Sequence, residues 1–184
     1  MNHKFLESER IFLRFYGEED LPNIFPLFSN LSVRQYYLPD LPRPQTEYQV
    51  REMLKTWHDE QHNYLFSIIE RETNKVIGLT NFDGLDWQNR NAEIGIGLAG
   101  NQHRGKGYAS EALGLLIEYG FDEIGLHRIY ARVIDGNEAS RNLFTRLGFT
   151  QEGLLREHVF RHGKYRNMFM FGLLRDEWTD QSSN

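Results

Sequence analysis

The segment from Gly95 to Glu111 constrains the fold of this chain more than any other stretch of its sequence. An apolar, strand-like run leads into a turn that is rich in glycine and basic residues, and an apolar helical pattern follows the turn. This order of strand, turn and helix directs free backbone N–H groups and the positive end of a helix dipole toward a phosphate. Glycine also allows the backbone to approach a ligand closely. The segment therefore predicts a cofactor site that the rest of the chain serves.

Length and composition indicate an ordinary globular protein. The chain has 184 residues, of which 40% are hydrophobic and 26% are charged, and these values predict a single domain over residues 1–184. The net charge of −5 argues against a general nucleic-acid partner and permits a cationic substrate. Because the chain has no cysteine, disulfide bonds, thiolate zinc sites and a cysteine nucleophile are excluded.

Export and membrane signals are not evident in the sequence. Residues 1–5 lack the apolar region of a signal peptide. No run approaches the roughly 18 apolar residues that a membrane-spanning helix needs. We therefore expect a cytoplasmic protein without a membrane partner.

Residue patterns predict an α/β protein with a mixed sheet. Three prolines predict a loop over residues 36–44, and Thr46 with Gln49 has the spacing of a helix-capping box. We expect the tail from Thr179 to Asn184 to be frayed. Strands are expected over residues 10–15, 64–70, 76–83, 92–98, 128–134, 149–160 and 165–174, and helices from residue 18, from residue 46 to about 61, and over residues 108–123 and 138–147.

Two common nucleotide-binding motifs fit the glycine-rich segment poorly. A Walker A loop needs a hydroxyl residue after its Gly-Lys step, and neither Gly-Lys step of this chain has one. Gly95-x-Gly97-x-x-Gly100 matches the dinucleotide fingerprint literally, but a helix should open there, whereas residues 101–107 read as loop. The elements before it also form hairpins rather than a repeating βαβ pattern.

A third motif, Gln102-x-x-Gly105-x-Gly107, resembles the acetyl-CoA pyrophosphate motif of the GNAT N-acetyltransferases. The resemblance extends over nearly the whole chain and implies the GNAT (acyl-CoA N-acyltransferase) fold, with a mixed, mostly antiparallel central sheet flanked by helices. Other segments, in the same order along the chain, resemble the RimJ/RimL-type branch of ribosomal-protein alanine N-acetyltransferases or the wider superfamily: residues 9–14 with Asp20, 92–96, 137–149, 163–166 and 176–178.

The resemblance implies how acetyl-CoA would bind. In that fold the strand over residues 92–98 separates from the strand over residues 128–134, and the pantetheine arm lies in the resulting V. The residues implied for the arm are Ile96, Gly97, Leu98, Asn137 and Ser140, and those implied for the pyrophosphate are Gln102, His103, Arg104, Gly105, Lys106, Gly107, Tyr108 and Ala109.

Acetyl transfer to an amine needs a group that removes a proton from the amine and stabilisation of the thioester oxygen. By strand alternation, Glu93 shares a face with Gly95 and Gly97, which makes it the candidate base; the alternative is a strand glutamate in an ion pair. Many GNAT enzymes carry a tyrosine acid where this chain has Phe144. Ser140 or a water then protonates the CoA thiolate, or no acid is needed; alternatively, Ser140 is an ordinary helix serine.

The amine acceptor is the least constrained part of the prediction. Tyr36 and Trp87 fall in or near loops, and Glu157 and His158 lie by the last hairpin, so we expect these four residues near the acceptor, with Glu157 as a reserve base. His58 and His62 have helical i,i+4 spacing but lack a third ligand, and they predict surface histidines rather than a metal site.

Two classes of function follow. The first is an acetyl-CoA-dependent N-acetyltransferase that acts by direct attack in a ternary complex, with a peptide or ribosomal-protein N-terminal amine as the first acceptor and a polyamine or a small, antibiotic-type amine as the second. The second class is a CoA-binding module without catalysis, which Phe144 keeps open. A monomer and a homodimer, paired through the edge of the last hairpin, are both compatible with the sequence.

Overall fold

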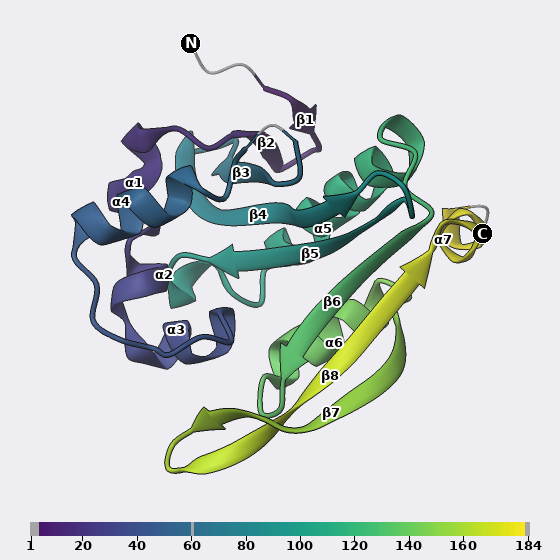
Figure 1. Ribbon diagram of the computed structural model, residues 1–184. Helices are drawn as coiled ribbons and strands as arrows, with labels where there is room; N and C mark the ends of the chain where they lie inside the picture. Colours follow the sequence, from purple (N-terminus) through teal and green to yellow (C-terminus); the bar gives the residue numbers. More distant parts are fainter. Residues whose placement is uncertain (1–3, 60, 183–184) are drawn as a thin grey trace.

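A computed structural model describes residues 4–59 and 61–182 of the chain. Its strands form one sheet in the order β1-β2-β3-β4-β5-β6-β8-β7 (Figure 1). Every neighbouring pair is antiparallel except β5 and β6, which are parallel. The predicted mixed, mostly antiparallel sheet is therefore confirmed. The strands are β1 Leu6–Glu7, β2 Ile11–Phe15, β3 Tyr64–Glu70, β4 Lys75–Asp86, β5 Asn91–Leu98, β6 Arg128–Ile134, β7 Thr150–Arg161 and β8 Lys164–Leu174.

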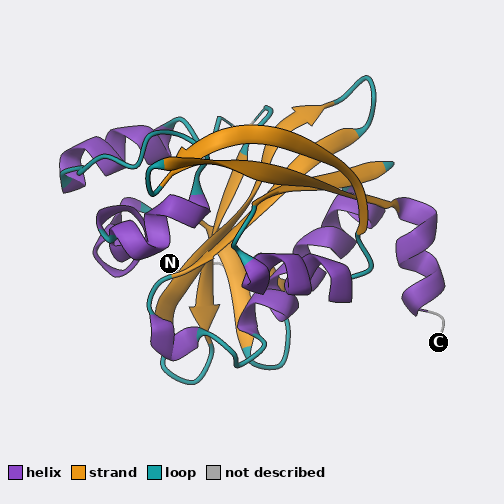
Figure 2. Ribbon diagram, turned by 90° about the horizontal axis from the view of Figure 1, so that it is seen from below, coloured by secondary structure: helices purple, strands orange, loops and turns teal. Residues whose placement is uncertain are grey.

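Helices lie on both sides of the twisted sheet (Figure 2). Alternate residues of a strand face opposite sides, so Leu65 packs with the helices near the N-terminus, whereas Phe66 packs with the later helices. The helices are α1 Leu21–Ile24, α2 Pro26–Ser29, α3 Leu31–Tyr37, α4 Glu47–Lys55, α5 Tyr108–Glu118, α6 Glu138–Arg146 and α7 Arg175–Ser182, with short 3-10 turns at Glu18–Asp20 and Asn101–His103 and a π-helical turn at Tyr119–Glu123.

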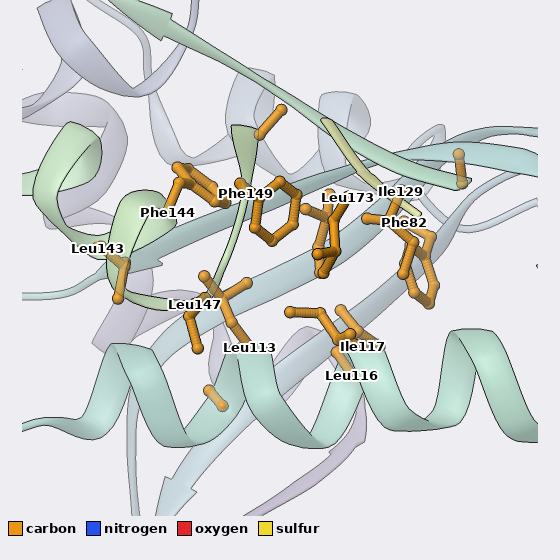
Figure 3. Close-up of a cluster of buried hydrophobic side chains, with 14 of the residues drawn as sticks. Phe82, Leu113, Leu116, Ile117, Ile129, Leu143, Phe144, Leu147, Phe149 and Leu173 are labelled. Atoms are coloured by element: carbon orange, nitrogen blue, oxygen red, sulfur yellow. The ribbon is translucent and has the colours of Figure 1, made fainter. Parts of the chain in front are cut away.

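The larger core lies between the sheet and helices α5 and α6 (Figure 3). Leu113, Leu116 and Ile117 of α5 are fully buried and face side chains of the sheet. Burial of each such side chain contributes about 1.5–3 kcal/mol to folding. Phe144 of α6 belongs to this core: it is 4% exposed, and its ring centroid lies 5.1 Å from that of Phe149. The position that carries a tyrosine acid in many GNAT enzymes is therefore a packing position here.

Several predicted element boundaries were wrong in the first third of the chain. The helical pattern from Glu18 is broken into short helices, because Pro26 lacks the N–H that a continuous helix needs at that position. The predicted loop over residues 36–44 begins later than expected, since α3 continues to Tyr37. Thr46 and Gln49 do form the predicted capping box of α4.

Helix α4 ends at Lys55 rather than near residue 61. The carboxylate of Asp59 accepts hydrogen bonds from the backbone N–H groups of Gln61, His62 and Asn63, which fixes a turn in place of helix. His58 and His62 therefore do not share a helix face as their i,i+4 spacing suggested.

Three further boundaries differ from the predictions. The helix after the glycine-rich turn changes to a π-helical turn at Tyr119. Helix α7 continues to Ser182, where fraying was expected from Thr179 to Asn184; Ser183 and Asn184 lie outside the described residues. The two-residue strand β1 was not predicted.

Strands β5 and β6 pair only over a short distance and then separate (Figure 1). Their last paired residues are Glu93 and Tyr130. Beyond that point β5 stays paired with β4 as far as Leu98, and β6 stays paired with β8 as far as Ile134. The predicted V between these two strands is therefore confirmed. Within the described residues, no helix is long and apolar enough to cross a membrane.

Candidate active site

A cavity of about 990 Å³ opens where β5 and β6 separate. Its walls come from the edge of β5, the segment from His103 to Ser110, helix α3 with the loop that follows it, and the first turns of α6. The volume lies at the upper end of the range that small-molecule and cofactor sites occupy. One cavity is therefore large enough to hold a cofactor and a second substrate together.

The glycine-rich turn forms the cofactor side of this cavity. Gly105 and Gly107 have φ angles of +72° and +86°, in the left-handed region that favours glycine. A Cβ atom added to Gly105 would meet nothing within 4 Å, so the turn presents open backbone there. Helix α5 begins after Gly107 without a side-chain cap, which leaves its first N–H groups available to an anion. This geometry suits a phosphate group.

Most of the predicted cofactor residues line the cavity. Gln102 and Lys106 do not. The side-chain amide of Gln102 lies 3.2 Å from His103 Nε2, and the backbone carbonyl of Lys106 accepts a hydrogen bond from Arg10 at 2.8 Å. The predicted cofactor residues that line the cavity are Ile96, Gly97, Leu98, His103, Arg104, Gly105, Gly107, Tyr108, Ala109, Asn137 and Ser140.

The start of helix α6 borders the cavity opposite β5. Asn137 caps this helix, since its side-chain oxygen accepts a hydrogen bond from the Ser140 backbone N–H at 3.3 Å. Ser140 is partly buried and lines the cavity, as does Phe144. Ser140 lies one helical turn before Phe144 on α6, and its role in proton transfer stays a prediction.

Glu93 of β5 lines the cavity and is paired with an arginine of β6. The Arg132 guanidinium donates from Nε to both carboxylate oxygens, at 2.8 and 3.0 Å, and its Nη2 lies 2.7 Å from Oε2. The hydrogen bond to Glu93 raises the pKa of Arg132. The ion pair that we weighed as the alternative for Glu93 is present. It also fixes the Glu93 carboxylate in position at the cavity wall, which a base requires.

Asp83 was missed by the sequence predictions. It lies directly opposite Glu93 in the β4–β5 pairing, so both carboxylates project from the same face of the sheet into the cavity. Asp83 is exposed, and its carboxylate has no hydrogen bond or ion pair with any described residue. Counting back from the turn would have placed Gly84 opposite Glu93, because the pairing shifts by one residue between Asp83 and Asp86, so no local signal would have found Asp83.

Tyr37 also lines the cavity. Its ring covers Gly97: a Cβ atom added there would lie 2.7 Å from the ring, so position 97 must be glycine for Tyr37 to pack on β5. Burial raises the pKa of Tyr37, which keeps the phenol protonated. Its hydroxyl has no hydrogen-bond partner among the described residues.

The loop after α3 is held over the cavity by a buried arginine of β7. The Arg161 guanidinium donates to the carbonyl oxygens of Gln35, Leu38 and Asp40 at 2.8–3.0 Å. Arg161 is 6% exposed, and burial lowers its pKa. Although no helix or strand forms there, this part of the cavity wall is therefore fixed by hydrogen bonds.

Of the four residues predicted near the acceptor, the structure brings only Tyr36 to the cavity. Trp87 lies in the β4–β5 turn, where its indole N–H donates to the Gln61 carbonyl at 2.8 Å. Glu157 and His158 line a separate hollow beside Asn167, where β7 bulges away from regular pairing with β8. β7 is the edge strand of the sheet, with β6 and β8 between it and β5, which a continuous strand pattern did not show.

Comparisons with known proteins find acetyltransferases that are similar to this chain over most of its length. The family described as Acetyltransferase (GNAT) domain matches residues 10–150. The uncharacterized N-acetyltransferase p20 of Bacillus licheniformis is 39% identical over 176 residues, 94% of this chain and 97% of p20. The putative ribosomal N-acetyltransferase YdaF of Bacillus subtilis is 37% identical over 103 residues, 56% of each chain. The crystal structure of spermidine N-acetyltransferase from Vibrio cholerae in complex with CoA and spermine superposes with a TM-score of 0.83 and 25% identity, over 92% of this chain and 98% of that one.

These matches confirm the predicted family but not its predicted branch. The family match and the likeness to p20 each span most of the chain. The likeness to the ribosomal enzyme covers little more than half of it, so the RimJ/RimL-type branch is not specifically supported. The chain belongs to the GNAT acetyltransferase family and is an acyltransferase.

Proposed function

We propose that this enzyme transfers the acetyl group of acetyl-CoA to a primary amine of a polyamine or a similar small polycation. The observation that carries the proposal is the pair of carboxylates, Asp83 and Glu93, which stand opposite each other in the cavity beside the free edge of β5. A polyamine is a chain of ammonium groups, and carboxylates in a concave site attract such a cation. A peptide N-terminus was our first prediction from the sequence, but with Glu93 as the base and paired with Arg132, Asp83 remains as a further carboxylate that a peptide N-terminus does not need.

The relatives support the same choice. The enzyme from Vibrio cholerae, which superposes over nearly all of this chain, was crystallised with CoA and spermine. The net charge of −5 on this chain is compatible with attraction of a cationic substrate.

Each side of the cavity has its own task in the proposed reaction. Backbone N–H groups between Arg104 and Ala109 hold the pyrophosphate, and the unpaired edge of β5 from Ile96 to Leu98 holds the pantetheine arm. A backbone N–H of this edge also stabilises the negative charge that develops on the thioester oxygen as the amine attacks.

Side chains carry the proton transfers. Glu93 removes a proton from the attacking ammonium, directly or through a water, while Arg132 keeps its carboxylate in place. Ser140 or a water returns a proton to the CoA thiolate as the carbon–sulfur bond breaks. Asp83 binds a second ammonium of the acceptor and so fixes which amine reaches the acetyl group.

The first test measures binding of acetyl-CoA by calorimetry and then supplies a panel of amines with a free-thiol readout. Spermidine and spermine are expected to have a higher kcat/KM than an aminosugar or a peptide that begins with alanine. A clear preference for the peptide would overturn the polyamine proposal in favour of the ribosomal-protein type. Binding of acetyl-CoA without thiol release for any amine would instead indicate a module without catalysis.

A substitution tests the role of Asp83. In Asp83→Asn, KM for spermidine is expected to rise about tenfold, the equivalent of about 1.4 kcal/mol, with little change in kcat, because only binding of the second ammonium is lost. KM for a monoamine such as benzylamine should not change.

Asp86→Asn is the matched control in the same hairpin. The carboxylate of Asp86 accepts hydrogen bonds from the backbone N–H groups of Gln88 and Asn89 and does not line the cavity. KM for spermidine should therefore stay at its wild-type value in this variant. An equal rise of KM in both variants would show that Asp83 has no specific contact with the amine.

A further inference from the structure

The turn that we assign to the pyrophosphate, residues 102–109 (the cofactor loop), is held from behind by Arg10. Arg10 lies directly before β2, far from the loop in sequence. Its Nη1 donates to the backbone carbonyl of Lys106 at 2.8 Å, and its guanidinium lies 5.2 Å from the centre of the Tyr108 ring. The hydroxyl of Tyr108 donates in turn to Glu70 at 2.6 Å. The loop is thus anchored to the β2–β3 side of the sheet through two of its residues.

The contact with Lys106 determines where the next N–H group points. The described chain contains no cis peptide bond, and in a trans peptide unit the C=O and the following N–H point in opposite directions. Because Arg10 holds the Lys106 carbonyl on its own side, the N–H of Gly107 is directed away from Arg10. A Cβ atom added to Gly107 would lie 3.1 Å from Arg10 Nη2, a tight contact, and the φ of +86° at this position independently favours glycine.

Arg10 also neutralises an acid in the first turn of α5. Its Nε and Nη2 lie 2.8 and 2.6 Å from Glu111 Oε2, and its backbone N–H donates to Oε1 at 3.1 Å. Ser8 donates to the same Oε1 at 2.6 Å. Burial tends to raise the pKa of Glu111, but these hydrogen bonds outweigh it, and the net pKa is lowered. Without Arg10, the partly buried Glu111 carboxylate would keep the hydrogen bond from Ser8 but lose its cation, and its negative charge in the first turn of α5 would oppose binding of a phosphate at this helix end.

We propose that Arg10 is a positioning residue for acetyl-CoA, which orients the cofactor loop and cancels the charge of Glu111 without touching the ligand. The inference rests on the proposed function, since it assigns the cofactor loop to the pyrophosphate. It predicts that loss of Arg10 weakens only ligands that carry the pyrophosphate, because the pantetheine arm lies along β5 and not on the loop.

The test uses two acyl donors and two arginine variants of the full chain. Arg10→Met should weaken acetyl-CoA binding about ten- to fiftyfold in calorimetry, while kcat/KM with S-acetylpantetheine, which lacks the pyrophosphate, stays within twofold of wild type. Arg71→Met is the matched control: Arg71 donates to Glu7 and to the Ser8 carbonyl in the same region but does not reach the loop. Arg71→Met should change neither the affinity for acetyl-CoA nor kcat/KM with S-acetylpantetheine.

Three outcomes would overturn the inference. The first is wild-type affinity of Arg10→Met for acetyl-CoA, and the second is an equal loss with both donors, which indicates a general disturbance of the fold. The third is an equal effect of Arg71→Met. Failure of the wild-type chain to bind acetyl-CoA at all would overturn the proposed function as well, so the two failures are distinguishable.

Discussion

The two sides of the cavity between β5 and β6 differ in the groups that form them: backbone groups on one side and side chains on the other. In the proposed function, the cofactor side depends chiefly on one continuous segment, residues 102–109, with its backbone N–H groups and glycine conformations. The acceptor side is an assembly of side chains from separate elements, with Asp83 on β4, Glu93 on β5 and Arg132 on β6. A backbone site is destroyed by adding atoms, whereas a side-chain site is destroyed by removing them. The difference also explains why a sequence motif reveals the first side and not the second.

The largest effect is expected from adding atoms to the cofactor side. In Gly105→Val the new side chain fills space that is open in the structure, at a φ of +72° that β-branched residues avoid. Loss of two charge-assisted hydrogen bonds to phosphate costs about 4 kcal/mol, so affinity for acetyl-CoA should fall about 10³-fold in calorimetry.

Gly125→Val is the control for backbone strain alone. Gly125 has a φ of +75° and equally open surroundings, but it lies between α5 and β6 and does not line the cavity. The Gly125→Val variant should lose about as much stability as Gly105→Val. Its affinity for acetyl-CoA should nevertheless equal that of wild type. Normal affinity in Gly105→Val would mean that the pyrophosphate lies elsewhere, and the comparison between the two sides would fail.

The next effect comes from removing charge on the acceptor side. Glu93→Gln keeps the size of the side chain but cannot accept a proton, so kcat/KM should fall about 10²-fold and lose the limb of its pH profile that reports the base. The affinity of Glu93→Gln for acetyl-CoA should stay within twofold of wild type. This one variant would then show that the acceptor side can be impaired while the cofactor side is intact.

Glu152→Gln provides the matched control for Glu93. Glu152 pairs with Arg128 on the same face of the sheet, yet neither residue lines the cavity. Kinetic constants for both substrates should not change in this variant. An unchanged kcat/KM and pH profile in Glu93→Gln would remove Glu93 from the mechanism and leave the ion pair with Arg132 as its only role.

The smallest effect concerns the stability that the Glu152–Arg128 pair contributes. The hydrogen bond from Arg128 lowers the pKa of Glu152 below its ordinary value of 4.5. A depressed carboxylate pKa stabilises the fold above the unfolded-state value and loses that contribution as pH falls through the native value. Urea unfolding at pH 7 should therefore show wild type more stable than Glu152→Gln by less than about 1 kcal/mol, because the pair is partly exposed. The difference should shrink below pH 4.5, and a difference that is independent of pH would contradict this account.

The part of the fold that short-range patterns encode could be predicted. The strand over residues 128–134 was predicted with its observed bounds, and the α4 capping box and the turn before α5 were also predicted correctly. Each depends on residues within a few positions of one another, such as Thr46 with Gln49. The predicted separation of β5 and β6 came from a resemblance to the GNAT family, and not from any local signal.

The sequence by itself determined the backbone site, because the glycines that permit its conformation and the helix that supplies its dipole are contiguous. Only the tertiary structure decided the acceptor side. The bulged register of the β4–β5 hairpin placed Asp83 opposite Glu93, the parallel pairing of β6 brought Arg132 to the same carboxylate, and the strand order put β7, with Glu157 and His158, at the edge of the sheet. Charges that meet across strands are set by pairing register and by bulges, which depend on the packing of the whole sheet rather than on neighbouring residues.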